Sequence, residues 1–508
     1  MLSGKPLSKL KMYWANFLHF YQPANQQSDI LEAVVVQSYR PIFEGLKKRP
    51  KIKLTINISG ALFELFDKYG YQDLIDILRL LGKNGQVEFT SSAKYHAFLP
   101  FLENEEIIRQ IKINDETNRF FLGESYRPQG FFPPEMAYAP KMAPLIADLG
   151  FKWIILDEIS LSGQTGQVDY QKIYQIKNTN LLVFFRERRL SNLIMSAVVR
   201  SRESLLEAMS GQLDKKNYTL IAMDGETFGH HRPGLEKMLF EVLETPEADL
   251  ITVSQISNFF PETIKVTPIE STWASSQEDI ETKTQFLSWS DPENRIHSWQ
   301  WKLMQLVCQE FYQMDKNHPR WQQIRQMVDV ALASDHFFWA SGEPWWSLEM
   351  IEDGAYRLLT TIRMIPNVSR NNLDLASHYY EEIVSTAFNW QRTGKIREMA
   401  REQKSILRIP FKDRTVGRGG EEKGVYDAFV KMMRDLEAKA AQKGQYEEAI
   451  LWRDAIFKLQ NKLDIYDTIN AIDLLRIKIP HKQVEDMIEK YKDQYRKIRG
   501  GQPEQRGK

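Results

Sequence analysis

The chain has 508 residues, of which 43% are hydrophobic, so it is long enough for a large core and at least one further domain. Its 67 Lys and Arg residues balance its 67 Asp and Glu residues, and this charge gives no reason to expect nucleic acid or an acidic membrane as a partner. With Cys308 as the single cysteine, the sequence excludes a disulfide framework and a cysteine metal site.

The N-terminal stretch, residues 1–20, has lysines followed by aromatic and polar residues in place of the uninterrupted apolar run of a secretory signal. No later stretch approaches the length of a membrane span. We therefore expect a cytoplasmic protein.

Through the first half of the chain, short runs typical of strands alternate with longer helical patterns. The strand-like runs are YWANFLHF, KLTINISG, QVEFTSS, KWIILDE, LLVFFRER and TLIAMDG, and ALFELFDKYG and DLIDILRLLG have helical spacing. This order predicts βα units around a parallel sheet or barrel. Ionisable residues recur at the carboxyl ends of the strands, where barrel enzymes carry their active sites: His19, Glu88, Glu135, Asp157, Arg186 and Asp224.

After residue 271 the strand pattern gives way to apolar-periodic segments such as WQWKLMQLVCQEFYQM, which predict packed helices. The stretch RIPFKDRTVGRGGEEKG, which ends at Gly424, is rich in charge and glycine and is typical of a linker. Two further helical patterns, joined by the turn KGQ, then predict a helical hairpin.

Five stretches place an ionisable residue among aromatic residues or beside Pro or Gly. They are LHFYQP (18–23), GQVEFT (85–90), GFFPPEMAYAP (130–140), MDGETFGHHRPG (223–234) and ASDHFFWASGEPWW (333–346). Each alone has an ordinary explanation: His19 as a core histidine, Glu88 as the partner of a buried Arg or Lys, and Glu135 as a helix cap. An unpaired buried carboxylate is costly, however, so a chemical role would also explain the cluster.

Taken together and in this order, the five stretches resemble the conserved regions of glycoside hydrolase family 57, the retaining enzymes that act on α-glucans. The resemblance covers roughly residues 12 to 350, and DGETFG is its most specific part. It implies that Glu135 is the catalytic nucleophile and Asp224 the general acid/base. It places four further residues at sugar subsites: His19, Glu88, Glu226 and Asp335.

The resemblance also implies an α/β fold, an incomplete (β/α)7 barrel followed by a helical region that contributes the fifth stretch. We therefore expect a catalytic barrel over residues 1–270 and a helical region over 271–408 that completes the active-site cleft. A linker over 409–424, a helical hairpin over 425–465 and a helical, partly disordered tail over 466–508 would follow.

Retaining glycoside cleavage needs two carboxyl groups about 5 to 5.5 Å apart, one to attack the anomeric carbon and one to protonate the leaving oxygen. Their environments must separate their pKa values. On a strand, Asp224 and Glu226 share one face, so their repulsion would raise the pKa of one of them. His230 and His231 either hydrogen-bond sugar hydroxyls or form a structural cap.

The third stretch, PPEMAYAP, lacks the Arg that more usually follows the family's nucleophile, so Glu135 would need another cation. Arg186, Arg188 or Arg189 in FRERRL could supply it. Among the tryptophans, Trp345 and Trp346 are the main candidates for platforms under sugar rings, with core packing as the alternative.

Residues 427–463 resemble the UVR motif, a helical hairpin used for protein contacts, on the match of YEEAILWRDAIFKL to its pattern. A two-helix unit buries too little surface to be stable alone, so we expect it to pair with a second copy, another protein or the barrel. The alternative is an ordinary hairpin packed on its own chain. A shared motif carries no function by itself.

The leading hypothesis is a hydrolase or 4-α-glucanotransferase for α-glucans or oligosaccharides that needs no cofactor or metal. A second hypothesis is a divalent-metal enzyme whose ligands would come from His19, Asp224, His230, His231 and Asp335. A third is a catalytically weak glucan-binding or scaffolding protein. Linkage, chain length and the balance of hydrolysis and transfer are not predicted.

Overall fold

The computed structural model describes residues 12–197, 199, 201–213, 215–342, 345–402, 423–461, 474–475 and 479. It divides into two compact units, which are described separately. The first comprises the described residues of Met1–Ser191, Leu206–Gly225 and Leu243–Ile409, and the second those of Asn192–Leu205, Glu226–Val242 and Pro410–Lys508. Over the described residues, the structure contains no helix with the length and apolar character needed to cross a bilayer.

In the first unit, one sheet is built around the central strand β1 (Met12–Phe20). This strand pairs in parallel with β2 (Leu54–Ile58), β8 (Tyr218–Asp224) and β9 (Ala248–Ile251), and β3 (Val87–Thr90) pairs in parallel with β2. The predicted parallel pairing of the first strands is therefore observed.

A second sheet has the order β10 (Thr263–Val266), β6 (Ile173–Ile176), β7 (Leu182–Arg186), β5 (Trp153–Asp157) and β4 (Gly130–Phe131). Its pairs are parallel except for β6 with β7, which is antiparallel. The second sheet is thus mixed whereas the first is parallel, and the α/β class expected from the sequence is confirmed.

Backbone hydrogen bonds connect the edges of the two sheets. Ser91 N donates to Gly130 O at 2.9 Å, and Phe132 N donates to Ser91 O at 2.9 Å, which joins the end of β3 to β4. Glu187 N donates to Leu220 O at 2.8 Å and joins the end of β7 to β8. The carboxyl ends of the strands are thereby held close to one another.

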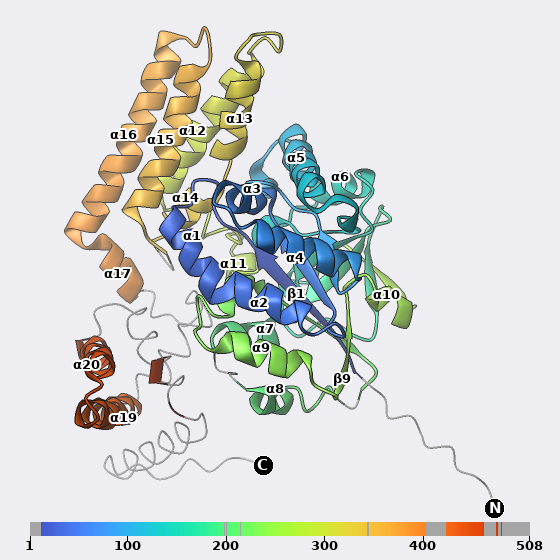
Figure 1. The fold of residues 1–508 in the computed structure, drawn as a ribbon. Coiled ribbons are helices and arrows are strands. Elements are labelled where there is room, and N and C mark those ends of the chain that lie inside the picture. The colour runs from blue at the N-terminus through green and yellow to red at the C-terminus, as the bar shows by residue number, and fades with distance from the viewer. Residues whose placement is uncertain are drawn as a thin grey trace, which may run out of the picture. The chain divides into compact units, whose positions relative to one another are not determined.

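Helices pack on the outside of these strands, as the blue and cyan ribbons of Figure 1 show. Amphipathic spacing explains them: in α4 the buried residues Leu74, Leu78 and Leu81 recur at four and three positions, and Ile75 and Ile77 flank them on the same face. The helices of this half of the first unit are α1 (Ser28–Val34), α2 (Arg40–Lys47), α3 (Gly60–Lys68), α4 (Gln72–Lys83), α5 (Asn104–Leu122), α6 (Met142–Asp148) and α10 (Ile256–Phe259). The helices α7 (Arg188–Met195) and α8 (Arg202–Ala208) include residues of both units, and α9 (Leu235–Leu243) belongs to the second unit apart from its last residue.

The second half of the first unit is helical, as predicted. Asn294, Ser347 and Ser369 are N-caps whose side chains accept backbone N–H groups of the first turn. The long helices α12, α13, α15 and α16 pack side by side (Figure 1). The helices are α11 (Gln277–Glu281), α12 (Arg295–Tyr312), α13 (Trp321–Ala331), α14 (Asp335–Phe338), α15 (Leu348–Met364), α16 (Arg370–Thr393) and α17 (Lys395–Glu402).

Alternate residues of four strands meet in one apolar cluster and so share one face of the sheets. The cluster contains Ala15 and Phe17 of β1, Trp153 and Ile155 of β5, Phe184 of β7, and Leu220 and Ala222 of β8. Because side chains alternate with a period of two, the next residue on this face of each strand is His19, Asp157, Arg186 or Asp224. The apolar interior therefore ends in a polar rim at the carboxyl ends.

In the second unit, α19 (Lys423–Gln442) and α20 (Tyr446–Asn461) pack on each other. Their shared core includes Phe429, Met433 and Trp452. Helices are therefore present where the sequence predicted them. The predicted linker over 409–424 lies outside the described residues apart from the start of α19, and so does the tail over 466–508 apart from 474–475 and 479.

Candidate functional site

The polar rim brings together residues that are far apart in the sequence. His19, on β1, is the register partner of Asn57 on β2 and of Asp224 on β8. Asp157, on β5, is the register partner of Arg186 on β7. All five lie at the last or next-to-last rung of their strands, so their side chains form one polar layer above the apolar interior.

Glu135 enters this layer from the loop after β4, and its backbone conformation is unusual. Both Glu135 and Met136 have positive φ angles, 61° and 48°. For non-glycine residues this conformation costs roughly 1–3 kcal/mol each, and such costs are typically found at functional positions. Trp273 N donates to Glu135 O at 3.1 Å, which fixes the loop.

The Glu135 carboxyl group is held by one strong donor. Trp273 Nε1 donates to Glu135 Oε2 at 2.7 Å, and the Glu135 side chain is only 15% exposed. The second oxygen, Oε1, lies 3.7 Å from His96 Nδ1. One carboxyl oxygen is therefore anchored, and the other faces a histidine.

Burial raises the pKa values of both rim carboxyl groups, and charge repulsion adds to the shift of Glu135. Burial, and then the charge of Asp224, raise the pKa of Glu135 to about 8, against the opposing effect of the Trp273 hydrogen bond. Burial raises the pKa of Asp224 to about 6, although the cation of Arg186 opposes the shift. Two such groups behave as a pair that holds one proton near neutral pH.

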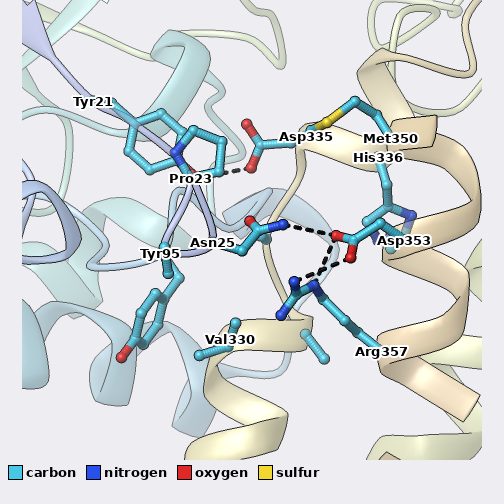
Figure 2. A pocket seen from close by; sticks show the side chains of 14 residues that line it. Tyr21, Pro23, Asn25, Tyr95, Val330, Asp335, His336, Met350, Asp353 and Arg357 are labelled. Atoms are coloured by element: carbon cyan, nitrogen blue, oxygen red, sulfur yellow. Dashed lines mark hydrogen bonds and ion pairs between the residues drawn. The ribbon is translucent and has the colours of Figure 1, made fainter. Parts of the chain in front are cut away.

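Asp335, the first residue of α14, adds a third carboxyl group. The Tyr21 hydroxyl donates to Asp335 Oδ2 at 2.7 Å, as the dashed line in Figure 2 shows. Burial raises the pKa of Asp335 to about 6. Both residues line a cavity of about 30 Å³, whose other side carries Asp353, bound to Asn25 and Arg357 (Figure 2). This volume is enough for about one water molecule.

His19 and His96 form a buried pair beside these carboxyl groups. His19 Nδ1 lies 2.8 Å from Asn57 Oδ1, and His19 Nε2 lies 3.2 Å from His96 Nε2. The His96 ring stacks on Tyr21 with a centroid distance of 4.3 Å. Burial lowers the pKa of His19 to about 4 and also lowers that of His96, so both rings are neutral at pH 7.

The arginines of FRERRL do not lie where the sequence suggested. Arg186 Nη1 and Arg188 Nε bind the two oxygens of Asp157 at 3.2 and 2.7 Å, because a buried carboxylate needs cationic partners. The Arg186 guanidinium also lies over the Trp273 ring, 5.6 Å from its centroid. It acts on Asp224 rather than on Glu135, and Arg189 donates to a backbone carbonyl.

Glu88 is a further correction to the sequence-based set. Its carboxylate accepts hydrogen bonds from Thr55 Oγ1 at 3.0 Å and from Ser254 N at 3.2 Å. Glu88 lies two residues before the end of β3, so its side chain points into the interior below the rim layer. Burial raises its pKa. Among the described residues, its hydrogen-bond partners are thus a hydroxyl and a backbone amide and not the Arg or Lys that the alternative expected.

Glu226 and His230 belong to the second unit. Glu226 is buried, and its carbonyl accepts from His231 N at 2.8 Å. Burial lowers the pKa of His230, whose ring lies 5.4 Å from that of His231. The site built from Glu135, Asp224 and their neighbours contains residues of the first unit alone. Within the described residues, no group of three or more His, Cys, Asp and Glu side chains is arranged to bind a metal ion.

The two tryptophans predicted as sugar platforms pack among other aromatic residues. Trp346 Nε1 donates to Gln391 Oε1 at 2.7 Å, and its ring stacks on Trp390 at 6.1 Å. The Trp345 ring lies 5.3 Å from that of Trp339. These contacts favour a packing role in the helical region. The neighbouring Glu343 and Pro344 lie outside the described residues.

Sequence reasoning missed Tyr21 and His96 as site residues, and it did not identify Trp273 as the donor to Glu135. Tyr21 stands inside LHFYQP, and His96 stands in SSAKYHAFLP directly after a predicted strand. The signal for His96 is the same as for the other five stretches, an ionisable residue among aromatics before a proline. Its positive φ of 55° could not be read from the sequence.

Comparison with known proteins gives a consistent result. The model of glycosyl hydrolase family 57 matches residues 9–268. An alpha-amylase of Pyrococcus horikoshii is 25% identical over 274 residues, which are 51% of this chain and 42% of that protein. A 4-alpha-glucanotransferase of Thermococcus litoralis is 24% identical over 280 residues, 52% and 42% of the two chains. The chain thus spans less than half the length of these relatives.

Solved structures show the same fold at low identity. The crystal structure of a branching enzyme from Pyrococcus horikoshii superposes with a TM-score of 0.56 and 18% identity, over 73% of this chain and 94% of that one. The 4-alpha-glucanotransferase of Thermococcus litoralis superposes with a TM-score of 0.55 and 18% identity, over 70% and 60% of the chains.

Proposed function

This chain belongs to glycosyl hydrolase family 57, and from this premise we propose that it cleaves the glucosidic bonds of α-glucans and transfers the cleaved unit to water or to a sugar hydroxyl. The observation that carries the proposal is the interacting pair of Glu135 and Asp224 in the polar rim. Two interacting carboxyl groups at the carboxyl ends of parallel strands are the groups that retaining cleavage requires.

In this proposal, Glu135 attacks the anomeric carbon while Asp224 protonates the leaving glycosidic oxygen, and a covalent glycosyl-enzyme forms. Asp224 then takes a proton from water or from an acceptor hydroxyl, which displaces Glu135. The hydrogen bond from Trp273 supports the role of Glu135, because an N–H donor stabilises a carboxylate more than a carboxylic acid.

The reaction requires the shared proton to be on Asp224 when cleavage begins. In the free protein the higher pKa belongs to Glu135, so the proton resides there near pH 7. A bound glucan brings a glycosidic oxygen to Asp224, and this acceptor favours the proton on Asp224. Substrate binding would therefore both position the bond and ionise the nucleophile.

The remaining finer assignments are part of the same proposal. The series of strands joined by hydrogen bonds would form the incomplete (β/α)7 barrel, and His19 and Asp335 would bind sugar hydroxyls at its rim. The packed helices α19 and α20 would form a UVR-like module for contact with a protein, since Tyr446 and Ile450 of α20 are exposed. Sedimentation of the wild type and Tyr446→Glu would test this contact.

The activity is tested by product analysis after incubation with maltoheptaose and with soluble starch. Glu135→Gln and Asp224→Asn are each expected to lower the rate by several orders of magnitude, because each removes one of the two reacting groups. Glu88→Gln is the matched control, since it neutralises a buried carboxyl group below the rim. Shorter and longer products together indicate transfer, and shorter ones alone indicate hydrolysis. Equal activity of wild type and Glu135→Gln would refute the proposal.

A further inference from the structure

A groove outside the catalytic pair lies between α13 and α15, two helices of the first unit that pack side by side (Figure 1). Its volume is about 490 Å³. Ligand pockets in proteins typically measure roughly 300–1,000 Å³, so the groove has the size of a binding site. We call it the helical groove, and the lining residues that matter here are Gln326, Met327 and Val330 of α13 and Asp353, Tyr356 and Arg357 of α15.

The charges that line the helical groove cancel each other. Arg357 Nε donates to Asp353 Oδ2 at 2.8 Å and Arg357 Nη2 donates to Asp353 Oδ1 at 3.1 Å, while Asn25 Nδ2 donates to Oδ2 at 3.0 Å (Figure 2). Among the described residues, no other charged side chain lines the groove. Because this ion pair has no net charge, the groove does not select an anion such as a phosphate, or a cation. Its lining suits a neutral ligand.

The remaining side chains combine an aromatic and apolar surface with polar groups. Tyr356 is 51% exposed, and Met327 and Val330 are partly buried. Gln326 is exposed, and neither its amide nor the Tyr356 hydroxyl forms a hydrogen bond with another described residue. A pyranose ring has faces made of C–H groups and a rim of hydroxyls, so a protein needs both kinds of surface to bind it. The helical groove provides both.

The helical groove lies next to the cavity of the candidate site. Val330, Asp353 and Arg357 line both hollows, and the cavity is also lined by Tyr21 and Asp335. We propose that the helical groove binds glucosyl units of a polymeric α-glucan, remote from the bond that is cleaved. The inference rests on the proposed function for the identity of the ligand and adds a second binding site to it. A polymer held at this site has a raised local concentration at the catalytic pair.

The first test is the affinity of the full chain for soluble starch, measured by electrophoresis through gels that contain starch. All variants carry Glu135→Gln, so that the starch is not consumed. Tyr356→Ala removes the aromatic surface and Gln326→Ala removes a hydrogen-bonding group, and each is expected to raise the Kd for starch about two- to tenfold. Phe388→Ala is the matched control, since Phe388 on α16 is 56% exposed but does not line the groove, and its Kd should not change.

The second test compares a long substrate with a short one in chains that keep Glu135. Tyr356→Ala is expected to raise KM for starch without changing kcat. Its kcat/KM for α-maltosyl fluoride should be unchanged, because this substrate has two glucosyl units and its fluoride leaves with little help from Asp224. Equal losses on both substrates would indicate a structural role for Tyr356 and would overturn the inference, and so would unchanged starch binding in both groove variants. If Glu135→Gln retains activity, the proposed function fails, whereas the comparison of starch affinities still decides the inference.

Discussion

Replacing Trp273 with Phe removes the one strong donor to Glu135 and leaves an aromatic ring under Arg186. The lost bond, 2.7 Å long, is to a charged group, and such bonds contribute about 1.5–3 kcal/mol. At about 1.36 kcal/mol per pKa unit, the pKa of Glu135 would rise by about 1–2 units above its value of about 8. The ionised nucleophile, and with it the rate at pH 7, would fall about 10- to 100-fold.

The assay is kcat/KM for α-maltosyl fluoride between pH 6 and 10. The loss should be largest below pH 8 and should shrink at higher pH, where Glu135 ionises in both proteins. Trp289→Phe is the matched control: Trp289 is also buried, but its indole N–H has no hydrogen-bond partner among the residues that the structure describes. Parallel pH profiles of wild type and Trp273→Phe would refute the assigned role of this hydrogen bond.

Glu135→Gln should be more stable than wild type at pH 8 and equal to it near pH 4.5. Native Glu135 keeps a proton that the unfolded chain loses between these pH values. The free energy of unfolding of the wild type therefore falls as the pH rises through this window. The difference, about 1.4 kcal/mol per pH unit as an upper bound, is measured by urea unfolding, and a constant difference would contradict the raised pKa. Arg186→Met should lower the free energy of unfolding by about 3 kcal/mol, since Asp157 keeps only one cation, and an unchanged urea midpoint would contradict this. Arg325→Met should cost about 3–5 kcal/mol because it leaves the buried Glu106 without its cation, and the added change Glu106→Gln should recover part of the loss in thermal melts.

The local sequence was sufficient to predict where the rim residues stand along their strands. The strand-like runs YWANFLHF and TLIAMDG carry His19 and Asp224 near their carboxyl ends. The alternation of strand-like and helical runs predicted the parallel pairing. The apolar-periodic segments after residue 271 predicted the helical second half. These features depend on period and propensity over a few residues, which is information that a short stretch contains.

The same reasoning failed where a residue's partners depend on how deep its side chain lies or on segments far away in the sequence. Glu88, like Glu135, is an ionisable residue in one of the five stretches. Its side chain lies below the rim, however, and accepts hydrogen bonds from Thr55 and Ser254. Arg186, Arg188 or Arg189 was considered as the cation for Glu135, yet Arg186 and Arg188 bind Asp157, because β5 and β7 are neighbours in register.

The sequence by itself predicted which ionisable residues stand at the ends of strands and that the second half of the chain is helical. Only the tertiary structure placed Trp273 on Glu135, 138 residues away, and His96 on His19, 77 residues away. It also set the positive φ angles of Glu135 and His96. Contacts between distant segments fix the hydrogen bonds, the burial and the charge neighbours of each group, and these three quantities set the pKa values on which catalysis depends.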